Sequence, residues 1–196
     1  MTEAQEYQLS IYLDFEKNII LNPDLFHRHP NIRPHFDIFC QQIQIILKTK
    51  HMIEESEKII NQYIQLRNEL AKNIILFSRK ITAFAMLEEL TDLQGLFCYS
   101  CEELLHAKDD KLLDTSKLIL RKTKEYVADI AEYGINDCSI TNFQNIIDQF
   151  MSLRTDKKSS DQIAEDAAKH ISSLLLNTEI LFNNKLAPLA ETSVNS

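Results

Sequence analysis

The sequence is poor in the residues that break helices. It contains 2 glycines and 4 prolines among 196 residues, whereas average usage would give roughly 14 and 10. Hairpin turns and strand bulges depend on glycine, so this composition excludes a many-stranded sandwich or barrel. It also leaves no glycine-rich phosphate loop, which excludes the nucleotide-binding folds that need one. The composition predicts an all-α protein and specifies an architecture far better than an activity.

Positive charge and long apolar runs are scarce as well. The net charge is −8, so the chain lacks the basic footprint of proteins that bind nucleic acid or anionic membranes. No apolar run approaches the roughly 18 residues of a membrane-spanning helix. The segment Met1–Glu6 lacks the basic and apolar regions of a secretory signal. We therefore expect a cytoplasmic protein with reduced cysteines and no cofactor, which binds neither nucleic acid nor membrane.

The spacing of apolar residues predicts a single all-helical domain. The expected architecture is an antiparallel bundle of four to five long helices, with a short N-terminal helix and a long C-terminal helix. The expected parts are an N-terminal helix at 1–21, a linker rich in proline and histidine at 22–34, the bundle at 35–187 and a disordered tail at 188–196.

Inside the bundle, local signals predict where helices begin and end. Glu54–Glu57 is the expected break between the second and third helices, because Ser56 can cap a new helix and the acids suit its first turn. Gly95 is expected to end the third helix. A fourth helix is expected from about Asp109 to Tyr133, followed by a turn in which Gly134 takes the left-handed cap position and Asn136 caps the fifth helix.

The fifth helix contains a polar stretch, 154–161. Steps of seven from Phe143 and from Ile147 return to apolar residues in the same register after this stretch, which favours one continuous helix. Ser159 and Gln162 resemble a capping box, which would instead start a new helix there. A continuous helix would extend beyond the end of the fourth helix, and its apolar residues there would need another helix to pack against. We expect the first helix to supply it through Tyr12, Phe15 and Ile19, packed on Ile171, Leu175 and Phe182.

Three short patterns between Lys80 and Phe150 point to a family. They are Lys80-Ile81-Thr82-Ala83-Phe84-Ala85, the turn Tyr133-Gly134-Ile135-Asn136, and the apolar series Ile140, Phe143, Ile147 and Phe150. The stretch from Leu70 to Leu189 resembles a set of uncharacterised helical-bundle proteins of Bacteroidetes. In that set the turn usually reads Tyr-Gly-Val-Thr, and Pro-Arg tends to precede the last helical stretch, where this chain has Ser159-Ser160-Asp161. The resemblance implies a helical bundle and implies no activity.

One cluster contains residue types that bind metals. Cys98 and Cys101 form a Cys-x-x-Cys pair, and Glu103 and His106 form a Glu-x-x-His pair. Thiolates and imidazole could bind zinc, and Glu-x-x-His occurs in di-iron bundles. Both kinds of site need a second paired set, which the sequence does not supply. These four residues are weak metal candidates, and free thiols without metal are the prediction.

Two further groups are weak binding candidates. The segment 27–35 has no acidic residue and could hold an anion or an acidic surface, or be a solvated linker. Arg154 and Asp161, with Lys157 between them, could form a charged layer inside the bundle, or lie where the bundle opens to water. The basic candidates of the first group are His27, Arg28, His29, Arg33 and His35.

No arrangement of serine, cysteine, histidine and acid indicates a catalytic site. The sequence therefore favours a non-catalytic helical-bundle protein that acts through contacts with a protein partner or with itself. The alternative is a bundle that binds a small molecule or a metal in a cavity between helices, near 98–106 or 154–161.

Overall fold

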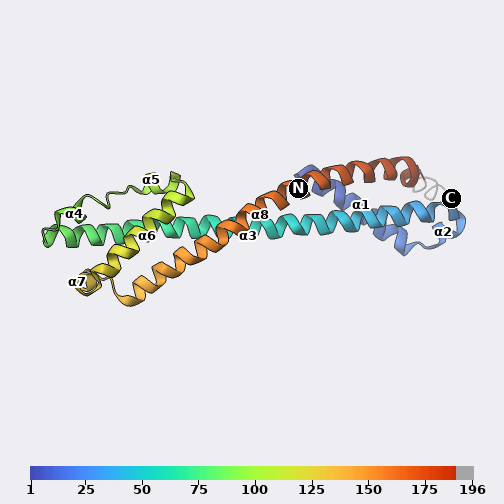
Figure 1. Cartoon of the computed structure of the whole chain (residues 1–196). Helices are drawn as coiled ribbons and strands as arrows, with labels where there is room; N and C mark the ends of the chain where they lie inside the picture. Colours follow the sequence, from blue (N-terminus) through green and yellow to red (C-terminus); the bar gives the residue numbers. More distant parts are fainter. Residues whose placement is uncertain (189–196) are drawn as a thin grey trace. The chain divides into compact units, whose positions relative to one another are not determined.

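A computed structural model describes residues 1–188, apart from the side chain of Leu25. It is 89% helical, and no strand occurs among these residues. The predicted all-α architecture is confirmed, while most of the tail expected at 188–196 lies outside the described residues. The main helices are α1 (Glu3–Leu21), α3 (Arg33–Leu87), α6 (Asp109–Glu125) and α8 (Asp137–Leu181) (Figure 1).

Short helices connect these four, and one π-helical turn, η3 (Phe182–Leu186), follows α8. The connecting helices are α2 (Asp24–Arg28), η1 (Pro30–Ile32), α4 (Thr91–Gln94), α5 (Cys101–His106), α7 (Val127–Ile130) and η2 (Ala131–Tyr133). The expected linker at 22–34 is thus partly helical. The expected fourth helix is interrupted at Tyr126, where the backbone leaves helical geometry, with φ −117° and ψ 24°.

The chain forms two compact units. Unit 1 consists of Met1–Glu57 and the chain from Ser160 onward, and unit 2 consists of Lys58–Ser159. Both α3 and α8 contribute to each unit.

The break expected at Glu54–Glu57 is wrong, because α3 continues through it for 55 residues. At 1.5 Å per residue its length is about 82 Å. Ser56 caps nothing: it is 4% exposed and lies in mid-helix, three residues after the buried Ile53. Serine and glutamate are tolerated inside helices, and no glycine or proline forces a break there.

The continuous last helix is confirmed, because α8 runs unbroken from Asp137 to Leu181. In the predicted steps of seven from Phe143, Phe150 and Ile171 are buried, and the two members between them, Lys157 and Ala164, are half-buried. In the series counted in sevens from Ile147, two of the buried positions lie one residue earlier than predicted. Ser160 and Ala167 are buried, whereas the expected Asp161 and Ala168 are exposed. A charged side chain there reaches solvent, and the small serine takes the buried place beside it.

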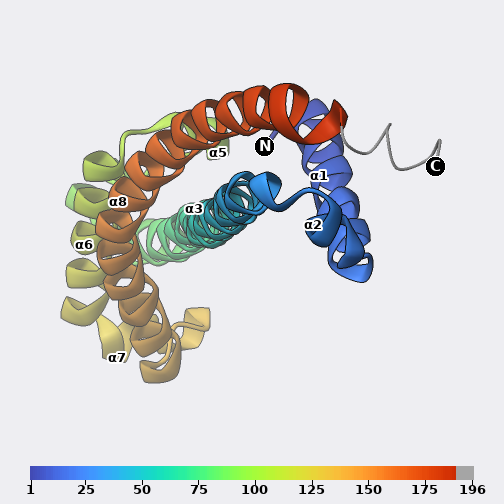
Figure 2. The ribbon, with the colours of Figure 1, turned by 90° about the vertical axis from the view of Figure 1, so that its right-hand side faces the viewer.

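In unit 1, α1 covers α3 and the last part of α8, as predicted. Figures 1 and 2 show α1 beside this part of α8. Phe182 contacts Tyr12 and Phe15 with ring centroids 5.4 and 4.9 Å apart, and Phe39 contacts the same two rings at 5.5 and 5.6 Å. The core also contains Leu9, Ile43, Ile46, Ile171 and Leu175, all less than 5% exposed.

In unit 2, α6 takes the third position beside α3 and α8. Phe77 of α3 stacks on Phe143 of α8, with ring centroids 4.6 Å apart. Ile119 of α6 is fully buried in the same cluster. Two α6 hydroxyls in this core, Ser116 and Thr123, donate to backbone carbonyls four residues earlier, so their burial leaves no unsatisfied donor.

Two left-handed residues end helical segments of unit 2. Gly134 has φ +73° after η2, and Asn136 accepts a hydrogen bond from the Ser139 N–H at 2.9 Å to cap α8, so the predicted turn is confirmed. The end predicted at Gly95 is wrong. Helix α3 stops at Leu87, where Glu89 takes φ +54° and the Leu90 N–H donates to the Ala85 carbonyl at 2.8 Å. This six-to-one bond is the Schellman pattern, built here without glycine.

These two positions predict opposite effects on stability. Gly134→Ala should lower the free energy of unfolding by about 1 kcal/mol, because alanine is strained at positive φ and its Cβ would lie 3.2 Å from Lys80 Nζ. Glu89→Gly should raise it by up to about 1 kcal/mol, because glycine removes the strain of a left-handed glutamate. Urea unfolding followed by circular dichroism measures both changes. If both substitutions changed the free energy of unfolding in the same direction, the result would contradict the left-handed conformations of these two residues.

Candidate functional site

A polar cluster of unit 2 surrounds the start of α6. Asp109, the first residue of α6, accepts a hydrogen bond from the Tyr63 hydroxyl, which lies 2.7 Å from both carboxylate oxygens. Arg67 Nε and Arg154 Nε lie 3.5 and 3.6 Å from the same carboxylate. Arg154 Nη1 also donates to Asp110 at 2.6 Å. The cluster connects α3, α6 and α8 through balanced opposite charges.

The cluster also fixes the chain before α6. Arg67 donates to the Leu105 carbonyl at 2.8 Å and to the Ala107 carbonyl. These carbonyls lie at the C-terminal end of the short helix α5, which is held to the core by the fully buried Leu104. Since every charged member has a partner inside the protein, the cluster is suited to holding helices together rather than to binding a ligand.

Tyr63 is the central side chain of this cluster. It is 8% exposed and stacks on Phe150 with ring centroids 5.5 Å apart. Burial, together with the hydrogen bond to the Asp109 carboxylate and its negative charge, raises the pKa of Tyr63 to about 12. Lys157 Nζ lies 5.6 Å from the ring centroid, which is a cation–π distance.

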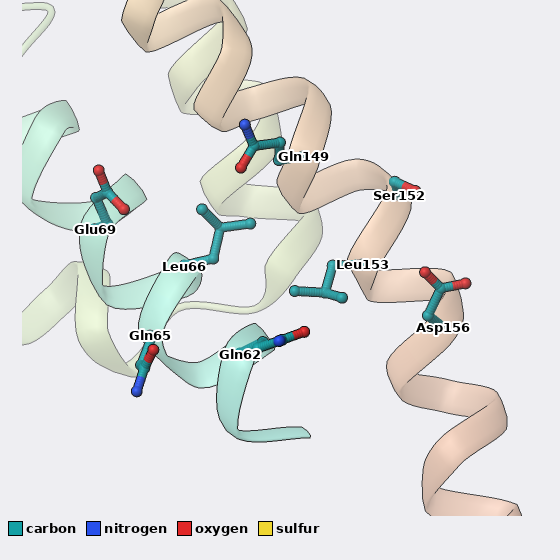
Figure 3. A pocket seen from close by; sticks show the side chains of 8 residues that line it. All are labelled: Gln62, Gln65, Leu66, Glu69, Gln149, Ser152, Leu153 and Asp156. Atoms are coloured by element: carbon teal, nitrogen blue, oxygen red, sulfur yellow. The ribbon is translucent and has the colours of Figure 1, made fainter. Parts of the chain in front are cut away.

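A surface groove runs between α3 and α8 in the same unit (Figure 3). Its volume is about 420 Å³, and only these two helices line it. Leu66 and Leu153, both partly buried, contribute the apolar part of the lining. Figure 3 shows Gln62 and Gln149 pointing across the groove toward the opposite helix.

The rest of the groove lining is polar and carries two acids. The six polar residues that line it are Gln62, Gln65, Glu69, Gln149, Ser152 and Asp156. Within the described part of the chain, none of their side chains has a hydrogen-bond or ion-pair partner. The groove therefore offers amide, hydroxyl and carboxylate groups beside two leucines, and it contains no basic residue.

The predicted metal candidates do not come together. Cys98 and Cys101 are exposed free cysteines on either side of Ser100, whose hydroxyl caps α5 by accepting from the Glu103 N–H at 3.0 Å. Glu103 is paired with Lys111 at 2.7 Å, and His106 is exposed. Among the described residues, no group of three or more histidine, cysteine, aspartate or glutamate side chains could hold a metal ion.

The predicted basic segment is a surface feature of unit 1. His27, Arg28 and His29 are exposed, and Arg33 lies over the Phe26 ring with 5.8 Å to the centroid. His35 is half-buried at the start of α3. None of these five forms an ion pair among residues 1–188.

The predicted charged layer is only partly present. Arg154 belongs to the cluster around Asp109 in unit 2, whereas Asp161 is exposed and belongs to unit 1. Sequence reasoning missed Asp109 and Asp110 as the partners of Arg154, and Tyr63 as the donor to Asp109. One signal was available, because Arg67 is the single polar residue in an apolar series at helical spacing on α3. The other members of that series are Tyr63, Leu70, Ile74, Phe77, Ile81 and Phe84. The groove residues gave no signal, since exposed polar residues occur on every helix of a bundle.

Comparisons of the chain with protein-family models, with curated proteins and with solved structures found no match. Nor does any helix over residues 1–188 have the length and apolarity to cross a membrane.

Tyr63→Phe tests the cluster. The phenol must be protonated to donate to Asp109, so its stabilising contribution is present below pH 10 and is lost as the pH rises through about 12. The variant should lower the free energy of unfolding by about 1–2 kcal/mol at pH 7. The difference from the original protein should shrink between pH 10 and 12, measured by urea unfolding. A difference that stays constant over this range would contradict the raised pKa.

Proposed function

We propose that the protein is non-catalytic and acts by binding a helix of another protein in the groove between α3 and α8 of unit 2. The observation that supports this is the combination of two leucines with six polar side chains that have no partner among the described residues. A docked helix could pack apolar side chains on Leu66 and Leu153 and hydrogen-bond with the amides beside them. Glu69 and Asp156 would favour a partner with basic residues at its edges.

The lining of the groove favours a protein partner over a small molecule. Small-molecule sites usually enclose most of the ligand in a mainly apolar pocket. The volume of about 420 Å³ would suffice, but two helices alone leave the groove open along its length. Most of its lining residues are also polar, which suits the edge of a protein interface.

We also propose that the protein is cytoplasmic. The four cysteines, Cys40, Cys98, Cys101 and Cys138, are all free, and three of them are exposed. Exposed thiols persist in a reducing compartment. A binding role without nucleic acid or membrane is consistent with the net charge of −8.

Site-specific photo-crosslinking tests the function. A photoreactive residue replaces Gln65 or Ser152 in the groove, or Thr155 on the exposed surface of α8 as the control. In the source cells, both groove positions should crosslink to one and the same protein, and the control position should not. Binding of that purified protein should weaken by about tenfold in the Glu69→Lys/Asp156→Lys variant. Crosslinking that is equal at all three positions would contradict the proposal.

A further inference from the structure

Unit 1 has large apolar side chains that are exposed on its surface and do not pack in its core. Tyr7 and Ile11 of α1 are 70% and 41% exposed, and Leu176 and Ile180 of α8 are 57% and 53% exposed. Each pair is spaced four residues apart, which places its two members one above the other on the same side of a helix. Single exposed apolar residues are ordinary, but contiguous ones mark interaction surfaces.

The two pairs belong to neighbouring helices that run in the same direction. Gln5 Nε2 lies 3.2 Å from Ser172 Oγ, and Gln8 Nε2 lies 3.3 Å from the carboxylate of Glu179. Leu176 follows Ser172 by four residues and precedes Glu179 by three, so helical spacing places it on the edge of α8 that borders α1.

The two pairs also point to the same side of this helix pair. Leu9 and Tyr12 of α1 face the core that α1 shares with α3. At 100° per residue, Tyr7 and Ile11 lie on the flank of α1 that points away from α3. On α8, Ile171 faces the core, and counting 100° per residue from it places Leu176 and Ile180 on the side that points away from α3. We call the four residues Tyr7, Ile11, Leu176 and Ile180 the outer face.

Two acidic residues of α1 border the outer face. Glu3 and Asp14 stand one turn before Tyr7 and one turn after Ile11, and neither has an ion-pair partner among the described residues. Lys169 of α8, which precedes Leu176 by seven residues, is already paired with Glu165 at 2.7 Å. The chain segments that make up unit 1 contain 14 acidic and 7 basic residues.

We propose that the outer face is a docking site for a basic amphipathic helix of a partner protein, separate from the groove of unit 2. An apolar stripe on the partner would pack between the two pairs, in the helix-on-helix mode of peptide recognition. Lysine or arginine beside that stripe would pair with Glu3 and Asp14, which have no internal cation. A second copy fits less well, since a two-fold pairing would place two acidic rims together.

A synthetic peptide pair provides the test. The probe is a fluorescent amphipathic helix of roughly 18 residues, with leucine along one face and lysine on its flanks, and its counterpart has glutamate in place of lysine. Fluorescence anisotropy with the full chain should show binding of the lysine peptide only. Leu176→Ser/Ile180→Ser should weaken that binding at least about tenfold, because the anchoring apolar contacts are lost. Glu3→Lys/Asp14→Lys should weaken it as well.

The matched control is Met86→Ser/Leu87→Ser, which removes two exposed apolar side chains of unit 2 that are 62% and 71% exposed. This control should bind the lysine peptide as the original protein does. Equal binding by both serine variants, or by both peptides, would overturn the proposal. Sedimentation and vesicle flotation complete the test. Self-association, or binding to anionic vesicles, that is lost in Leu176→Ser/Ile180→Ser would assign the face to a second copy or to a membrane instead.

Discussion

The burial of one apolar face along two very long helices is the constraint on which the rest of the structure depends. Helix α3 has 55 residues and α8 has 45, whereas α1 has 19 and α6 has 17. No single short helix can cover either long one. In unit 1 the cover is α1, through the rings of Tyr12 and Phe15, and in unit 2 it is α6, through residues such as Ile119. Amphipathic helices of this length are stable because tertiary packing supplies most of their stability.

Local chemistry made some of this fold predictable. Gly134 and Asn136 mark a turn because their conformational and capping preferences act within a few residues. Ser56 failed as a signal, because serine and acids also fit a helix interior when tertiary contacts continue on both sides. The end of α3 gave no signal, since a glutamate, Glu89, takes the left-handed position. The one-residue error at Asp161 arose because heptad counting does not tell a buried serine from an exposed acid beside it.

The polar sites were less predictable than the helices. Arg67 interrupts an apolar series, which indicates a buried or bridging role, but its partner Asp109 lies 42 positions further along the chain and spacing alone cannot reach it. This cluster satisfies its own charges and stabilises unit 2. The groove and the outer face differ from this cluster in the same way. Both combine apolar side chains, partly buried in the groove and exposed on the outer face, with polar groups that have no partner within residues 1–188. This difference is the physical reason to treat them as surfaces for other molecules.

The unbroken course of the two long helices is the central claim, and native-state hydrogen exchange tests it most directly. Peptides covering 52–60 of α3 and 152–162 of α8 contain the stretches where the sequence suggests or permits a break. Continuous helix predicts that their amides exchange as slowly as those of the helical residues on either side, because each remains hydrogen-bonded within its helix. Exchange of either peptide at the rate of an unstructured chain, with the flanking residues protected, would contradict the account.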